Sequence, residues 1–218
     1  MKTNPKFAVV LAGCGVYDGA EIHEAVLTLY AIQNNGGDFE IFAPEIAQHH
    51  VVNHLTGQPT GETRSVLVES ARIARGNISP LGEFKPAEFD VLILPGGFGV
   101  AKNLCSFAFD GPDCRVDPDV EAAILGMHQS GKPIGALCIA PVILARLIPG
   151  VLVTIGQDAG TAGGITAMGG RHQSTGLREV VVDQGNRIVT TPCYMLDSNL
   201  VDIAAGADLA VRELIRMI

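Results

Sequence analysis

The stretch "GKPIGALCIAPVILARL", residues 131–147, predicts a buried strand that turns directly into a helix. Gly135 and its small neighbours let the chain bend tightly, and Cys138 lies at the corner. Pro141 suits the first turn of the following helix, because a missing N–H costs little at that position. A strand followed at once by a helix is the repeating unit of α/β proteins, so this stretch already indicates the fold class.

Outward from that stretch, apolar runs alternate with helical patterns. The runs that predict strands are residues 6–13, 39–44, 89–99 and 151–156, with two further strands in 178–192 around the turn "DQGN". Helices are expected in 21–37, 63–76, 117–131 and 198–218. Residues 161–170, "TAGGITAMGG", are too rich in glycine to assign. The alternation predicts an α/β fold with a mostly parallel central sheet.

Three expected strands end in unusual loops, "GCGVYDG" (13–19), "PGGFG" (95–99) and "LCIAP" (137–141). Ligand sites of parallel sheets lie at the carboxyl ends of the strands. These loops therefore predict one functional edge of the sheet.

Composition is even along the chain, so we expect one domain spanning residues 1–218. Hydrophobic residues make up 47% of the sequence, enough to cover both faces of a sheet. The formal net charge of −8 argues against a partner with a phosphate backbone or an anionic membrane surface, because such contacts need clustered Lys and Arg. We therefore expect no nucleic-acid and no membrane partner.

The N-terminal sequence has no signal-peptide pattern, and no apolar segment reaches the roughly 20 residues of a membrane span. The five cysteines form no CxxC pair and no metal-binding spacing with histidine, so we expect no metal and no cofactor. Together these features predict a cytoplasmic protein with free thiols.

Cys138 is the candidate nucleophile. A strained corner between strand and helix exposes the side chain that it carries, as in a nucleophile elbow. The amides and dipole of the helix N-terminus favour the thiolate, which is the reactive form. The alternative is a buried structural cysteine. Cys14 and Cys193 are possible pocket residues, whereas Cys105 and Cys114 fall in a loop.

Two glutamates open the first helix, and their expected roles differ. The spacing from Asp18 to Glu21 fits a capping box, with Asp18 as the N-cap and Glu21 bonded back to its amide. Glu24 lies one turn further on and has no such role in the cap. Glu24 is therefore the better candidate to face the thiol, and its alternative role is a solvated acid in the first turn.

The loop with Gly96 and Gly97 lets the backbone approach a ligand closely. An amide from this loop, together with the amide of Ile139 after the nucleophile, would stabilise a developing oxyanion. The alternative is an ordinary tight turn.

These motifs resemble the PfpI superfamily, whose fold is that of class I glutamine amidotransferases and which includes glyoxalase III enzymes. The resemblance is closest to its ElbB branch, the enhancing-lycopene-biosynthesis proteins, through "GCGVYDG", "EIHEAVLTL", "NHLTG", "PGGFG", "AKNL", "CIAP" and "IVTTP". It covers nearly the whole chain and implies a flavodoxin-like three-layer sandwich and a homodimer. By position, it implies Cys138 as nucleophile, Glu24 as acid, and Gly97 and Ile139 as oxyanion donors.

The chain departs from that superfamily in its histidines. Amidotransferases of this fold carry a His and a Glu near the C-terminus, but no His follows His172 here. Ile139 follows Cys138, where related proteases and deglycases commonly have a His. These departures argue against glutaminase and peptidase activity. Of the six histidines, His23 and His54 are the two expected near the pocket.

A Cys and a Glu without a His predict a glyoxalase-type reaction on a small dicarbonyl substrate, glyoxal or methylglyoxal, through a Cys138 hemithioacetal. An effect on isoprenoid biosynthesis is implied by the branch name alone. The alternative from another class is a redox sensor in which Cys138 is oxidised beside a protonated Glu24. A dinucleotide-binding oxidoreductase ranks third, because the acids after the first strand would repel a pyrophosphate.

Overall fold

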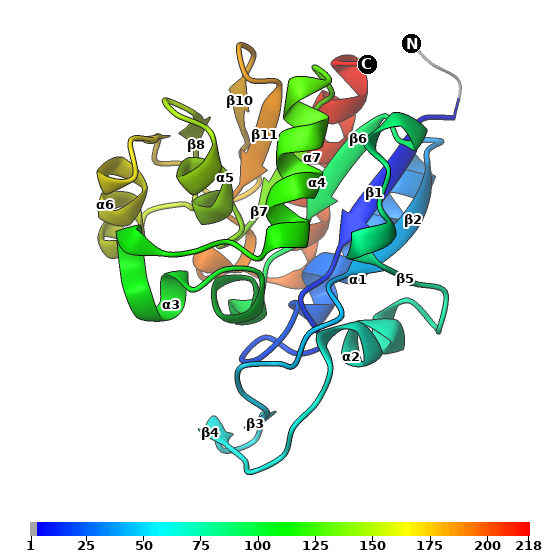
Figure 1. Cartoon of the computed structure of the whole chain (residues 1–218). Coiled ribbons are helices and arrows are strands. Elements are labelled where there is room, and N and C mark those ends of the chain that lie inside the picture. The colour runs from blue at the N-terminus through cyan, green and yellow to red at the C-terminus, as the bar shows by residue number, and fades with distance from the viewer. Residues whose placement is uncertain (1–3) are drawn as a thin grey trace.

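The computed structural model describes residues 4–218, and its centre is one seven-stranded sheet. The strand order is β10-β11-β7-β6-β1-β2-β5 (Figure 1). The strands are β1 (Lys6–Val10), β2 (Asp38–Ala43), β5 (Ser79–Pro80), β6 (Val91–Leu94), β7 (Ile134–Leu137), β10 (Val181–Asp183) and β11 (Ile188–Thr191). All neighbours pair in parallel except β10, which runs antiparallel to β11. The predicted mostly parallel α/β sheet is confirmed.

Helices cover both faces of this sheet. Figure 1 shows α4 (Pro118–Gln129) in front of the sheet and α1 (Ile22–Asn34) and α7 (Leu200–Arg216) behind it. Helix α5 (Pro141–Leu147) packs with α4, and α1 packs with α7. Strands β6 and β7 are buried along their whole length, as expected of strands covered on both faces. The molecule is thus a flavodoxin-like three-layer sandwich.

Smaller elements surround the sandwich. They are α2 (Val66–Ile73), α3 (Phe107–Asp110), α6 (Ala159–Ala167), the π-helical turn η3 (Val100–Leu104), and the short strands β3 (Val52–Asn53), β4 (Gln58–Pro59), β8 (Leu152–Val153) and β9 (Arg171–His172). No helix within residues 4–218 is long and apolar enough to cross a membrane.

Helix α1 forms where its apolar spacing predicts it, but its apolar residues do not all face the core. Ile22 and Val26 are exposed, whereas Ala25 and Thr28 are fully buried. Small residues line the buried side because α1 lies close to α7 and the sheet. The glycine-rich stretch that sequence left unassigned forms most of α6.

The predicted N-cap of α1 is wrong. Glu21, not Asp18, caps the helix, and its side chain accepts from the Glu24 amide at 2.7 Å. Asp18 instead accepts from the amide of Val52 at 2.6 Å, so it fixes the loop before α1 to a distant segment. Sequence spacing could not reveal this partner, because Val52 is brought there by the fold.

Candidate active site

Cys138 lies at a sharp corner between β7 and α5, as predicted. Its φ of 59° is in the left-handed region, which costs a residue other than glycine about 1–2 kcal/mol. Its amide donates to the carbonyl of Thr191 at 2.9 Å, which ties the corner to the end of β11. Only 7% of the residue is exposed, but that part lines a pocket.

Glu24 lies directly against this thiol. Its side chain is fully buried, and the Cys138 thiol and the Glu24 carboxyl hydrogen-bond to each other. The amide of Gly96 donates to Glu24 Oε2 at 2.9 Å, and the amide of Tyr194 donates to Oε1 at 3.1 Å. Both oxygens are therefore held in place, and the structure brings Glu24, rather than Glu21, to the sulfur.

Burial, with a smaller contribution from the nearby charge of Glu21, raises the pKa of the Glu24 carboxyl to about 8 despite the lowering effect of the Tyr194 amide. Burial also raises the pKa of the Cys138 thiol, and an ionised Glu24 would raise it more. The predicted preference for thiolate is thus opposed by desolvation. A Glu24 that is protonated at neutral pH removes the like charge and leaves one acidic proton beside the sulfur.

Two backbone amides converge on the same sulfur. Those of Gly97 and Ile139 hydrogen-bond to it and act to lower the pKa of the thiol. Gly97 has a φ of 104°, and a Cβ at this position would come within 2.3 Å of the Glu21 nitrogen. A glycine is therefore required to bring this loop against α1. The expected oxyanion donors lie together at the nucleophile.

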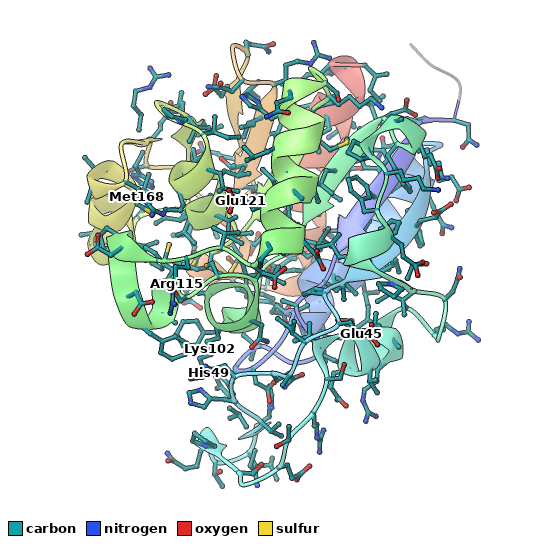
Figure 2. The ribbon with its side chains drawn as sticks, in the orientation of Figure 1. Glu45, His49, Lys102, Arg115, Glu121 and Met168 are labelled. Carbon is teal, nitrogen blue, oxygen red and sulfur yellow. The ribbon has the colours of Figure 1, made fainter. Side chains whose placement is uncertain are left out.

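A pocket of about 380 Å³ opens beside Cys138. It is lined by Val16, Glu21, Gly97, Phe98, Cys138, Ile139, Asp158, Thr161, Tyr194 and Met195. Sequence reasoning missed Asp158, Thr161 and Tyr194, which arrive from α6 and from the segment after β11. A larger cavity of about 590 Å³ lies elsewhere, around Arg115 and Glu121, which Figure 2 labels. It contains neither Cys138 nor Glu24.

The histidines differ in their relation to the pocket. His23 Nδ1 lies 3.1 Å from the Tyr194 hydroxyl and 3.7 Å from Glu21 Oε1, at the edge of the pocket. His54 contacts Asp18 and the ring of Tyr17 instead. Among the described residues that line the pocket none is a histidine. Of the candidate catalytic residues, the structure brings Cys138 and Glu24 together.

The other candidate cysteines occupy different places. Cys14 is half-buried, and burial raises the pKa of its thiol, with a smaller rise from the charge of Glu69 and a lowering by Arg72 on α2. Cys193 is buried, and the charges of Glu24 and Cys138 act on it. Neither lines the pocket. Within residues 4–218 no three His, Cys, Asp or Glu side chains gather in a way that would hold a metal ion.

The chain is similar in sequence to known proteins. A model of the DJ-1/PfpI family matches residues 14–191. The human glutamine amidotransferase-like class 1 domain-containing protein 3, mitochondrial, is 47% identical, over 97% of this chain and 83% of its own.

The chain is also similar in fold to solved structures. A crystal structure of an isoprenoid biosynthesis protein with an amidotransferase-like domain from Ehrlichia chaffeensis superposes with a TM-score of 0.92 and 39% identity, over 98% of this chain and 99% of the other. Glyoxalase III from Candida albicans shares the fold, with a TM-score of 0.63 and 14% identity over 98% and 97% of the two chains.

Proposed function

The chain belongs to the DJ-1/PfpI family, and from that premise we propose that it converts glyoxal or methylglyoxal to the corresponding 2-hydroxy acid. The observation that carries this proposal is the Cys138 thiol in contact with a carboxyl whose pKa is raised to about 8. Such a carboxyl both gives and takes protons near neutral pH. The glyoxalase III named above has the same fold, which is consistent with this chemistry.

The first step forms a covalent adduct. In the state that holds one proton between the two groups, the Cys138 thiolate attacks an aldehyde carbon of the dicarbonyl, and the carbonyl oxygen takes the proton of Glu24. This gives a hemithioacetal and leaves Glu24 as a carboxylate. The Gly97 and Ile139 amides stabilise the negative charge that develops on that oxygen. A small, uncharged dicarbonyl fits the pocket of about 380 Å³ with room to spare.

The second step moves a proton between adjacent carbons. The Glu24 carboxylate removes the proton from the carbon bonded to sulfur and returns it to the neighbouring carbon, while the hydroxyl proton of the hemithioacetal passes to the neighbouring oxygen. The product is a 2-hydroxy thioester. Water then hydrolyses the thioester, releases glycolate or lactate and regenerates the thiol. The hydrogen bonds to both Glu24 oxygens hold the carboxyl in one position beside Cys138.

We also assign the chain to the ElbB branch and infer a role connected with isoprenoid synthesis, supported by the name of the Ehrlichia chaffeensis protein at 39% identity. The cytoplasmic location expected from the sequence stays a prediction, because the human relative carries a mitochondrial name.

The proposal is tested by incubating the purified protein with glyoxal and measuring glycolate. We expect turnover by the wild type and by Cys14→Ala, which removes a thiol outside the pocket. Cys138→Ala and Glu24→Gln should each give no glycolate above the blank, because the first lacks the sulfur and the second lacks the proton donor and base. Equal glycolate from the wild type and from Cys138→Ala would refute the proposal.

A further inference from the structure

Cys193 is a buried thiol that the proposed reaction does not use. It follows β11, the strand beside β7, and its φ of 45° puts it, like Cys138, in the left-handed region. Two neighbouring parallel strands are thus each followed, within two residues, by a cysteine on a strained bend at the same edge of the sheet. Only 6% of Cys193 is exposed.

The register of the sheet brings these two cysteines together. Thr191, the last residue of β11, pairs with Leu137, the last residue of β7. The Cys138 amide donates to the Thr191 carbonyl at 2.9 Å, so Cys138 lies beside the end of β11, and Cys193 follows two residues later in the turn after that strand. A disulfide needs a Cα distance of about 4.4–6.8 Å, which the adjacent ends of two paired strands allow.

The carboxyl of Glu24 connects the two cysteines. The amide of Tyr194, the residue after Cys193, donates to Glu24 Oε1, and the Cys138 thiol hydrogen-bonds to the same carboxyl. The charge of Cys138 raises the pKa of the Cys193 thiol, after the larger effects of burial and Glu24. The two sulfurs therefore share one small, buried environment.

We propose that Cys193 is the resolving thiol of Cys138, so that oxidation by a hydroperoxide ends in a Cys138–Cys193 disulfide. Cys138 lines the pocket through which the oxidant enters, whereas Cys193 does not, so Cys138 reacts first. This inference concerns oxidation and holds whether or not the protein turns over a dicarbonyl.

The chemistry balances with hydrogen peroxide as the oxidant. The Cys138 sulfur attacks one peroxide oxygen, the O–O bond breaks, and the other oxygen leaves as water, which gives a sulfenic acid. The Cys193 sulfur then attacks the Cys138 sulfur, an S–S bond replaces the S–O bond, and the hydroxyl leaves as water with the Cys193 proton. Two thiols and one peroxide thus yield one disulfide and two waters.

A second pair of thiols, Cys105 and Cys114, serves as an internal control for disulfide formation. Cys105 and Cys114 interact with each other, and Cys105 lies opposite Val116 in an antiparallel bridge. Both fall in one tryptic peptide, residues 103–115, whereas Cys138 and Cys193 fall in two, residues 116–146 and 188–212. A disulfide in either pair is therefore distinguished by the peptide in which it appears.

The experiment treats the folded protein with mild hydrogen peroxide, blocks free thiols, and maps the tryptic peptides by mass spectrometry. In the wild type and in Cys14→Ala we expect peptides 116–146 and 188–212 to be cross-linked, and dithiothreitol to restore both thiols. In Cys193→Ala and Cys193→Ser, Cys138 should instead gain two oxygen atoms as a sulfinate that dithiothreitol does not reduce. Circular dichroism checks that each variant is folded.

The proposal is overturned if wild-type Cys138 becomes sulfinate as readily as in Cys193→Ala, without a cross-link between those peptides. It is equally overturned if the only disulfide lies within peptide 103–115. Because the readout is peptide mass rather than glycolate, its failure is separate from failure of the proposed dicarbonyl reaction.

Discussion

At the scale of single residues, Glu24 controls protonation of the site. Its carboxyl is fully buried on α1, and it is held by two amides rather than by a cation. Such an environment favours the neutral acid, because desolvation of a carboxylate costs more than two amide hydrogen bonds return. The same feature that suits Glu24 to carry a proton should also weaken the fold at high pH.

The pKa of Glu24 is raised from an ordinary 4.5 to about 8 in the folded protein, so the folded state holds a proton that the unfolded chain has lost. Its stabilising effect is complete below about pH 4.5 and is lost as the pH rises to about 8, at about 1.4 kcal/mol per pH unit. Glu24→Gln mimics the neutral acid and should remove this fall.

Urea unfolding between pH 5 and pH 8 measures the effect, with Glu45→Gln as the control because Glu45 is exposed. The stability of Glu24→Gln relative to the wild type should increase with pH, whereas that of Glu45→Gln should not. Parallel stability curves for the wild type and Glu24→Gln would contradict the buried, protonated carboxyl.

Gly96 separates the nucleophile from the carboxyl. A Cβ at this position would lie 2.2 Å from the Cys138 Cβ and 2.5 Å from Glu24 Oε2. Gly96→Ala should therefore displace one of them, destabilise the fold by about 1–3 kcal/mol and slow alkylation of Cys138 by iodoacetamide. Gly61→Ala is the matched control, because nothing lies within 4 Å of a Cβ there. Equal alkylation rates in the two variants would show that the site tolerates the methyl group.

At the scale of elements, α6 is a helix whose own sequence opposes it. It contains three glycines in nine residues, and each costs about 0.5–1 kcal/mol relative to alanine. A Cβ on Gly163 meets nothing within 4 Å, whereas a Cβ on Gly164 would lie 2.8 Å from the ring of Phe107. Gly163→Ala should raise the melting temperature, and Gly164→Ala should be less stable than Gly163→Ala. Identical melting temperatures would mean that Phe107 moves aside freely.

Helix α6 is a part of the fold that the sequence does not predict. Buried strands such as β6 and β7 are predictable because they are continuous apolar runs, and the corner at Cys138 is predictable from its small neighbours and Pro141. Helix α6 is not, because its glycines lack helix propensity and its packing against α3 and α5 decides its conformation.

Helix α1 shows that the sequence can predict a site residue correctly from a local argument that is wrong. Sequence spacing selected Glu24 over Glu21 to face the thiol, and the structure places it there, but the capping box used in that argument does not exist. Tyr194 and Asp158 reach the pocket from segments far from Cys138 in the chain. No local pattern marks them, because their role depends on the register of β7 and β11 and on the position of α6.

At the scale of the whole molecule, the outer side of α1 needs an explanation. Ile22, Val26 and Tyr30 follow one another at intervals of four residues and are 42%, 47% and 61% exposed. Side chains at this spacing form one stripe along a helix, and the stripe runs opposite the face that buries Glu24. An apolar stripe rarely faces water without a partner, so we propose that it is part of the homodimer interface that the family resemblance implies.

A symmetric dimer across α1 would stabilise the helix that positions Glu24. Dimer formation would then affect the position of the Glu24 carboxyl beside Cys138. Val26→Glu puts a charge in the centre of the stripe, and light scattering should show that it converts a wild-type dimer to a monomer. Leu55→Glu is the control, because Leu55 is an apolar residue 97% exposed in a loop away from α1. A Val26→Glu protein that stays dimeric would place the interface elsewhere, and a monomeric wild type would show that the chain forms no dimer. Either result would leave Glu24 held by α7 and the sheet alone.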